Sequence, residues 1–548
     1  MRTNTDCRAI NIFNSTSEQD ELTITGKTSI HIDTEPTEDS NYSTNWLEAI
    51  RTLGGTVNLN GGTHISMDIT QKEQSPLLSN YYIAGIYALS TDENAIYYED
   101  YIEPPDFTTE INLENESTID GITVQTSSEN FVSSAALKAS GTKASINVDG
   151  PMTIRNMTTQ NTQGDAYTYG VYTENGARIT FKDGLSISNL KAPTLNNNYT
   201  EAFALFSYGG GISVTSSDKD IVIIGETGAF SQEETDIPNI DIQFNTANSS
   251  LTGIAMLREP DWTNGGLKDD EGIIDFSFAP GATWNVLPAD SSTVSNYLHQ
   301  EDELLFSEMT SLKVDTGANV YLGSMKSSWD FLPQGFTTSP FNTTPDMAST
   351  PVQLRTKELD GNGNFYLRTD LHQDISDSVL ITESLSGSHT LYVKGGGSGE
   401  LVKEQTNSYL ARAENNVAAT GGEFSLAPNK EGLELVDIGL YNYKLETDVR
   451  RDYGREWYLV RSGSSTTPDS PTGETEAALS GFAGHYAMWY GYQTDLRKRL
   501  GEIRYGTQTG LWVRGFADKV QPPRALRHEL HPEPRRRLHR LRHAGGRG

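Results

Sequence analysis

The sequence contains a single cysteine, Cys7, among its 548 residues. One cysteine cannot form an internal disulfide bond, so no disulfide framework holds this fold together. A chain without crosslinks also remains threadable, which suits a secreted protein that must stay unfolded during export. Long apolar runs are missing as well. The longest clean aliphatic stretch, residues 221–224, is far too short to cross a bilayer as a helix.

The residues that follow Met1 lack the features of a signal peptide. They are mainly Thr, Asn, Asp and Glu, with neither a basic n-region nor an apolar h-region. We therefore expect the natural start of the protein to lie upstream of Met1.

Positive charge is scarce outside one segment. The formal net charge is −31, yet residues 520–548 contain eight Arg against two Glu, which leaves −37 on the remainder. Phosphate binding requires Lys and Arg, so this acidic body argues against nucleic acid and anionic membrane surfaces as its partners.

Sequence motifs typical of catalysis, nucleotide binding and metal binding are also missing. The chain has no Gly-x-Ser-x-Gly elbow, P-loop, His-Glu-x-x-His or cysteine pair. Six histidines are dispersed, and the pairs His528/His531 and His539/His543, although at helical ligand spacing, lie among many arginines. We expect no metal site, no cofactor and no catalytic residue.

Adjacent acids are the one pattern that could support an enzyme. Glu233-Glu234 and Asp269-Asp270 are examples, and a β-helix polysaccharide hydrolase or lyase would need such carboxylates in a groove. In a chain with 73 Asp and Glu such pairs arise by chance, so we interpret them as solvated surface. The enzyme remains the alternative hypothesis.

A repeat dominates the part of the chain that is rich in Thr, Ser, Asn and Gly. Two sets of apolar residues recur every 33 residues: Ile146, Ile179 and Ile212, and Val148, Phe181 and Val214. Glycines precede each set: Gly141, Gly176 and Gly211. Apolar residues at i and i+2 with a fixed long period predict stacked rungs, which bury their apolar faces only against neighbouring rungs. We predict an all-β fold, a right-handed parallel β-helix; the alternative is a pair of β-sandwiches.

The pattern changes after residue 360. Residues 361–461 contain a tighter set of strands, mostly led by aromatic residues, and residues 462–476 read as a Ser/Thr/Pro/Gly linker. A helical periodicity then covers residues 477–504, where Asp495 and Arg499 form an i,i+4 pair. Apolar and polar residues alternate within residues 505–519, which predicts one strand. The basic tail, residues 520–548, follows this strand.

This order of parts resembles a pertactin-like autotransporter of type V secretion. The most specific segments are "VDIGLYNYKLETDVRRDYGREWYLV" (436–460), "MWYGYQTDLRKRLGEIR" (488–504) and "GLWVRGFADK" (510–519). They are similar to the closing strands of the passenger, the helix in the barrel lumen and the first strand of the translocator barrel. Over residues 20–360 only the general composition matches, with Thr, Ser, Asn and Gly around short alternating strands.

The resemblance implies a division of labour. Residues 1–360 would be a β-helix passenger, and residues 361–461 an autochaperone-like region that folds first and templates other rungs. Its strands would contain Phe365, Leu367, Leu391, Val393, Tyr443, Leu445, Trp457 and Leu459. The start of the translocator would contain Leu500, Glu502, Arg504, Trp512, Arg514 and Phe516. Localisation at the outer membrane or cell surface, and contact with the outer-membrane insertion machinery if the barrel is complete, follow from the same resemblance.

The basic tail departs from the family pattern. A family barrel needs about 12 strands of ~9–11 residues, whereas residues 520–548 are rich in Arg, His and Pro. We interpret this tail as out of frame and the translocator as truncated; a genuine basic tail and a nonfunctional gene product remain alternatives.

One stretch could bind a partner. Residues 81–107 interleave acids with tyrosines, among them Tyr81, Tyr82, Tyr97, Tyr98 and Tyr101. Exposed tyrosines offer a large contact area at little entropic cost and suit a host surface protein or glycan. The alternative is that they pack the N-terminal rungs. The sequence therefore predicts an adhesin-like, non-enzymatic passenger.

Overall fold

The computed structural model describes residues 7–13, 20–34, 44–71, 80–90, 108–193, 199–231, 237–257, 272–286, 305–323, 351–371, 374–396, 409–414, 421–429, 432–438, 441–450, 454–462, 475–486 and 488–490. The chain forms two compact units. The larger comprises Met1–Ile438 with Tyr443–Val460, and the smaller Gly439–Asn442 with Arg461–Gly548. The larger unit is continuous across the predicted boundary at residues 360 and 361.

Almost all strands of the larger unit belong to three parallel sheets, which we call A, B and C. Sheet A has eight strands in the order β1 (Cys7–Phe13), β4 (Thr44–Leu53), β7 (Asn80–Leu89), β10 (Val132–Ser140), β13 (Ala166–Glu174), β16 (Thr200–Tyr208), β19 (Glu226–Phe230) and β22 (Ala255–Met256).

Sheet B has fifteen strands in the order β2 (Glu21–Ile24), β5 (Gly55–Leu59), β8 (Thr109–Leu113), β11 (Ala144–Val148), β14 (Arg178–Phe181), β17 (Gly211–Val214), β20 (Asn239–Phe244), β23 (Ile273–Phe278), β25 (Leu305–Val314), β27 (Val352–Gly361), β30 (Ser378–Leu385), β32 (Ala411–Ala413), β36 (Gly454–Arg461), β35 (Tyr441–Arg450) and β34 (Val436–Ile438).

Sheet C has thirteen strands, twelve of them on its main path: β3 (Thr28–Thr34), β6 (Thr63–Thr70), β9 (Ser117–Thr126), β12 (Met152–Asn161), β15 (Leu185–Lys191), β18 (Ile221–Ile224), β21 (Ser250–Thr252), β24 (Thr283–Val286), β26 (Asn319–Leu322), β28 (Asn364–Asp370), β31 (Ser388–Gly396) and β33 (Glu423–Leu426). The thirteenth, β29 (Ile375–Ser376), pairs with β28.

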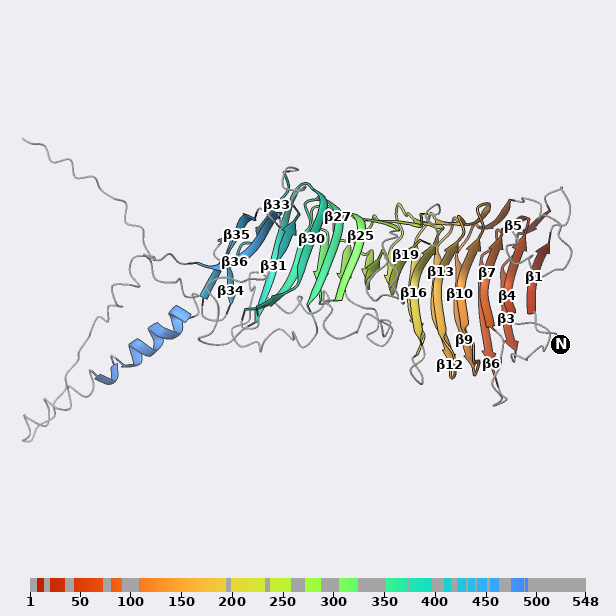
Figure 1. Cartoon of the computed structure of the whole chain (residues 1–548), viewed down its shortest axis with the longest axis horizontal. Helices are drawn as coiled ribbons and strands as arrows, with labels where there is room; N and C mark the ends of the chain where they lie inside the picture. Colours follow the sequence, from red (N-terminus) through yellow and green to blue (C-terminus); the bar gives the residue numbers. More distant parts are fainter. Residues whose placement is uncertain are drawn as a thin grey trace, which may run out of the picture. The chain divides into compact units, whose positions relative to one another are not determined.

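From β1 to β24 the chain visits the sheets in turn, so three successive strands make one rung (Figure 1). Strands β10, β11 and β12 belong to sheets A, B and C, and β13 returns to sheet A as the parallel neighbour of β10. This winding is a parallel β-helix, as predicted. The alternative of two β-sandwiches is wrong, because sandwiches are built from antiparallel sheets.

The predicted 33-residue period is confirmed by the strand register. Ile146 pairs with Ile179 and Ile179 with Ile212, so equivalent residues of β11, β14 and β17 stack directly. All three side chains are buried. Their alternation with polar outward residues is what the pleat of a strand with one buried face requires.

Two of the three glycines that precede the repeated residues have a positive φ. Gly141 and Gly176 have φ of 95° and 78°, in the region that L-residues with a Cβ avoid. Gly211, however, is a strand residue of β17 that pairs with Arg178. The equivalent turn residue is Gly209, with φ of 76°, whose carbonyl accepts a hydrogen bond from the Gly176 amide.

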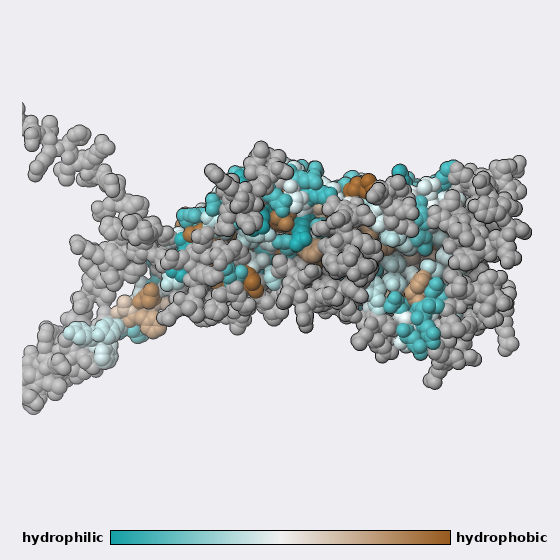
Figure 2. All heavy atoms as spheres, viewed as in Figure 1, coloured by the Kyte–Doolittle hydropathy of each residue, from teal (hydrophilic) through white to brown (hydrophobic). Residues whose placement is uncertain are grey.

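The interior of the β-helix is mainly apolar along the described rungs, with some buried hydroxyl side chains such as those of Ser134 and Thr159, which hydrogen-bond to each other. Large aromatic side chains fill it near β20, β23 and β24, where Phe244 stacks on Phe278 with ring centroids 4.5 Å apart. Trp284 stacks on Phe278 at 5.9 Å and its indole N–H donates to the Gly253 carbonyl at 3.0 Å. The surface that Figure 2 shows over the described rungs is largely hydrophilic, with isolated hydrophobic spots.

The C-terminal end of the larger unit differs from the other rungs. Among the described strands β22 is the last of sheet A, whereas sheets B and C continue. Sheet B then reverses direction, because β36 pairs with β32 antiparallel, Ala411 facing Trp457. Strands β35 and β34 complete it.

The smaller unit contains helical residues 475–486 and 488–490. The helix thus begins two residues before the predicted Ala477, and residues 491–504 lie outside the described residues. Its large apolar side chains are exposed, Phe482 at 77% and Trp489 at 55%. No helical segment among the described residues has the length and apolarity needed to span a membrane.

Candidate functional site

The outer face of sheet A carries a continuous array of aromatic side chains. Gly170 identifies the inner face, because a side chain there would meet Leu190 and Ile187 of sheet C. Rings gather on the opposite face, which we call the aromatic face: Trp46, Tyr82, Tyr87, Tyr167, Tyr169, Tyr172, Phe203, Phe206, Tyr208 and Phe230. The register of parallel strands places successive rings on neighbouring rungs, for example Tyr169 beside Phe203.

A lysine lies inside one part of the aromatic face. The Nζ atom of Lys138 is 4.8 Å from the ring centroid of Tyr172, and 5.4–5.6 Å from those of three other rings: Tyr82, Tyr87 and Trp46. Lys138 also forms an ion pair with Glu174 at 3.0 Å. Ring faces attract a cation, and the carboxylate of Glu174 neutralises its charge. The two interactions offset the free-energy cost of burying the Lys138 ammonium group.

The contact with Lys138 affects the pKa of Glu174. Burial alone would raise the pKa of its carboxyl group, but Lys138, with hydrogen bonds from Tyr172 and Ser140, brings that pKa below its ordinary value. Glu174 is therefore ionised and serves as the counter-ion of Lys138.

Glu226 has the opposite environment at the other end of the aromatic face. Its side chain is 3% exposed, pairs in register with Phe203, and its Oε1 has no hydrogen-bond partner. Burial, together with the charge of Glu201, raises the pKa of Glu226 well above its ordinary value. Among the described residues no salt-bridge partner is found for it, so its surroundings favour the neutral form of the carboxyl group.

The predicted tyrosines differ in their surroundings, and three of them lie outside the described residues. Tyr81 is only 2% exposed, so the prediction that it contacts a partner is wrong; its alternating position on β7 turns it into the fold. Tyr82 is half-buried and stacks on Trp46 at 4.4 Å, on the aromatic face. Tyr97, Tyr98 and Tyr101 lie outside the described residues, and their role remains a prediction.

The structure brings together carboxylates that the sequence did not single out. Asp241 and Asp275 are register partners on β20 and β23, although they are 34 residues apart. Burial raises the pKa of both, and in Asp275 the charges of Asp241 and Glu358 add to the effect. Only knowledge of the rung period could have found this pair. The predicted pairs, Glu233-Glu234 and Asp269-Asp270, lie outside the described residues.

Two of the described histidines, His389 and His31, contact polar groups of neighbouring residues. Burial lowers the pKa of His389 to about 4, so its imidazole is neutral at pH 7; Nε2 lies 3.0 Å from the Ser386 carbonyl oxygen, to which it donates when it carries the proton. Exposed His31 contacts the Ser66 hydroxyl at 2.9 Å. Within the described ranges no three His, Cys, Asp or Glu side chains are grouped as a metal site would need.

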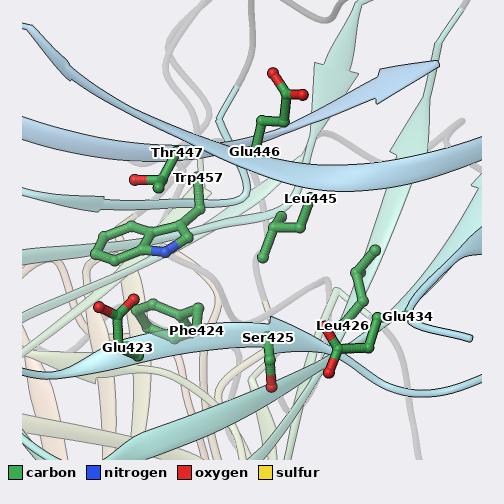
Figure 3. A pocket seen from close by; sticks show the side chains of 9 residues that line it. All are labelled: Glu423, Phe424, Ser425, Leu426, Glu434, Leu445, Glu446, Thr447 and Trp457. Atoms are coloured by element: carbon green, nitrogen blue, oxygen red, sulfur yellow. The ribbon is translucent and has the colours of Figure 1, made fainter. Parts of the chain in front are cut away.

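A hollow of about 130 Å³ lies at the C-terminal end of the larger unit (Figure 3). Strand β33 supplies one wall, with Phe424, Ser425 and Leu426, and strands β35 and β36 the other, with Leu445, Thr447 and Trp457. Phe424 and Trp457 pack edge to face at 5.1 Å. Three carboxylates complete the lining, those of Glu423, Glu434 and Glu446.

The residues predicted for the autochaperone-like strands occupy the interior of this end. Phe365, Leu367, Leu391, Val393, Tyr443, Trp457 and Leu459 are all buried. Leu445 is half-buried and borders the hollow. The predicted translocator residues, Leu500, Glu502, Arg504, Trp512, Arg514 and Phe516, lie outside the described residues.

The fold and the antiparallel end together define a parallel β-helix closed by a reversed strand. A family model described as Pertactin matches residues 335–461, the segment that contains this end. The chain is 28% identical over 206 residues to the pertactin autotransporter of Bordetella bronchiseptica, covering 31% of this chain and 21% of that protein. It is 29% identical over 178 residues to the BrkA autotransporter of Bordetella pertussis, covering 32% and 16%.

A third relative shares a shorter segment. The immunoglobulin A1 protease autotransporter of Haemophilus influenzae is 35% identical over 92 residues, 17% of this chain and 5% of that protein. The chain thus spans about a fifth or less of the length of the curated relatives that it matches. These matches confirm the resemblance noted from the sequence, a similarity to pertactin-like autotransporters.

Proposed function

We propose that this chain is a surface-displayed, adhesin-like passenger without enzymatic activity, and that it binds a host surface protein or glycan. The observation that carries the proposal is the β-helix whose C-terminal end matches the Pertactin model, together with the matches to pertactin and BrkA. The aromatic face supports it, because partly exposed rings such as Tyr167 and Tyr172 suit flat contacts with sugars or proteins.

In this proposal the parts of the chain have separate roles. The C-terminal rungs and their antiparallel end act as the autochaperone region, since strand addition to a preformed rung avoids the cost of nucleation. The exposed apolar side chains of helical residues 475–486 suit a helix that is enclosed by another part of the translocator, which the outer-membrane insertion machinery would assemble.

The test is an adherence assay with the purified chain on beads applied to cultured epithelial cells. Bead binding above that of albumin-coated beads is expected. The variant Tyr97→Ser/Tyr98→Ser is expected to reduce it by about tenfold if these rings are contact residues. Absence of adherence across epithelial and glycan-array surfaces would remove the adhesin proposal.

A second candidate function is polysaccharide hydrolysis, favoured by the register pairing of Asp241 with Asp275. Two carboxylates with raised pKa values on adjacent rungs fit a general acid and its partner. Release of reducing sugar that is abolished by Asp241→Asn, and unaffected by Asp218→Asn at an exposed site, would support this function over the first.

A further inference from the structure

We propose that the hollow beside β33 is a docking site for an extended peptide segment of a partner protein, which adds a strand to sheet C and carries Lys or Arg next to an apolar residue. This site is separate from the aromatic face, and the proposal goes beyond adhesion and holds whether or not the chain is displayed on a cell.

The first argument is the open edge of sheet C. Among the described strands β33 is the last of its sheet and pairs only with β31, with the Glu423 amide donating to Gly387 and the Ala427 amide to Leu391. Amide directions alternate along a strand, so those of Phe424 and Leu426 point to the other side. An edge of this kind is a template for an added strand.

Sheet B shows how this protein covers the outer edge of a C-terminal rung strand, β32, with strands of its own chain. There β36 pairs with β32 in the antiparallel sense, and β35 and β34 continue the sheet. The described part of sheet C has no such closure. The two sheets therefore end differently at the same end of the β-helix.

The second argument is the hollow along this edge. Its volume, about 130 Å³, is close to that of cavities that admit one small apolar group. Its walls include the apolar groups of Leu426, Leu445 and Trp457. An extended segment alternates its side chains, so one apolar residue can enter the hollow while its two neighbours point to the rim.

The third argument is charge. Glu423 is paired with Arg455 at 2.6 Å, and Glu446 with Lys444. Glu434 is exposed and has no ion pair among the described residues, so it leaves a net negative charge on the rim. A Lys or Arg of the partner would complement it. Exposed Leu433 beside it, at 49%, extends the apolar contact.

The experiment measures binding of a fluorescent seven-residue peptide of alternating Lys and Val to the purified full chain, by fluorescence anisotropy. Saturable binding is expected, and a Glu/Val peptide of the same length should not bind. Glu434→Lys should weaken binding by at least about threefold, whereas Glu383→Lys, at an exposed position of β30, should leave it unchanged.

Backbone pairing has its own readout. A Lys/Val peptide N-methylated at every internal residue lacks amide donors on both edges and should lose binding if the peptide forms a strand. Binding of the methylated peptide, or equal binding by the Glu434→Lys variant, would overturn the proposal. A concentration-dependent dimer that Glu434→Lys dissociates would assign the edge to a second copy of the chain and overturn it too.

Discussion

The N-terminal rungs and the C-terminal end of the β-helix bury charged side chains in different ways. On the aromatic face Lys138 is surrounded by rings and has a single counter-ion, and Glu226 has an oxygen without a hydrogen-bond partner. At the C-terminal end Arg368 forms two hydrogen bonds with Asp377, which also accepts the amides of Val352 and Arg368.

The buried charges of the aromatic face are incompletely paired, whereas the Arg368–Asp377 pair is fully hydrogen-bonded. Incompletely satisfied buried groups cost stability and tend to persist where function needs them, whereas fully bonded ion pairs fix a structure. The comparison fits the proposed contact surface on the N-terminal rungs and the proposed folding role of the C-terminal end, and four experiments test it.

The largest effect is expected for buried tryptophans in the two regions. Trp457→Ala and Trp284→Ala each remove a fully buried indole, and each should lower the free energy of unfolding by about 3–5 kcal/mol. If the C-terminal end templates the rungs, only Trp457→Ala should also slow refolding. Denaturant titration and stopped-flow refolding measure both; equal refolding rates would contradict the folding role.

The ion pair at the C-terminal end is next. Arg368→Met leaves the Asp377 carboxylate buried without its cation, which should cost about 3 kcal/mol of unfolding free energy. The matched control is Arg155→Met in the exposed pair Arg155–Asp120, where a loss below about 1 kcal/mol is expected. Similar losses in the two variants would mean that burial does not set the strength of these pairs.

Lys138→Met tests the aromatic face. The loss of the cation leaves Glu174 without its counter-ion, and a decrease of about 1–3 kcal/mol in unfolding free energy is expected. Trp46 provides a local signal, because its ring lies 5.6 Å from the Lys138 Nζ, so its fluorescence should change. Lys138→Arg keeps the charge and should show a smaller loss. A Lys138→Met protein more stable than the parent would refute this account.

Glu226 and Glu174 should give opposite pH dependences. The folded pKa of Glu226 is raised, so its contribution is present below the unfolded pKa and is lost as the pH rises towards the folded pKa. Glu226→Gln should therefore stabilise the protein at pH 7 and have little effect at pH 4. Each pH unit between the two pKa values is worth about 1.4 kcal/mol.

The folded pKa of Glu174 is lowered, so its contribution is present above the unfolded pKa and is lost as the pH falls through the folded pKa. Glu174→Gln should therefore destabilise at pH 7 and lose this effect in acid. Thermal unfolding from pH 3 to pH 8 measures both profiles, and parallel profiles would contradict the assigned environments.

Much of the fold followed from local pattern. Ile146, Ile179 and Ile212 repeat at a fixed spacing with β-type alternation, and both signals depend only on neighbouring rungs. The glycine signal was less reliable. Gly211 is a strand residue that follows Gly176 by 35 positions, and the residue with positive φ is Gly209, which follows Gly176 by 33.

The candidate sites were harder to predict. Tyr81 and Tyr82 are adjacent in sequence, yet only one lies on the aromatic face, and composition carries no information about which. Lys138 and Trp46 lie 92 residues apart, in rungs separated by β7. Their contact depends on rung lengths that vary between neighbours: Val132 pairs with Tyr81, 51 positions away, and with Ala166, 34 away.

The constant register between β11, β14 and β17 makes the length of this molecule modular. A segment such as residues 142–174 could be duplicated or removed and leave the residues on either side facing equivalent neighbours. Each such event would move the N-terminal rungs about 4.8 Å along the stack while the C-terminal end stays unaltered. The reach of such a protein can therefore evolve separately from its folding and its contacts.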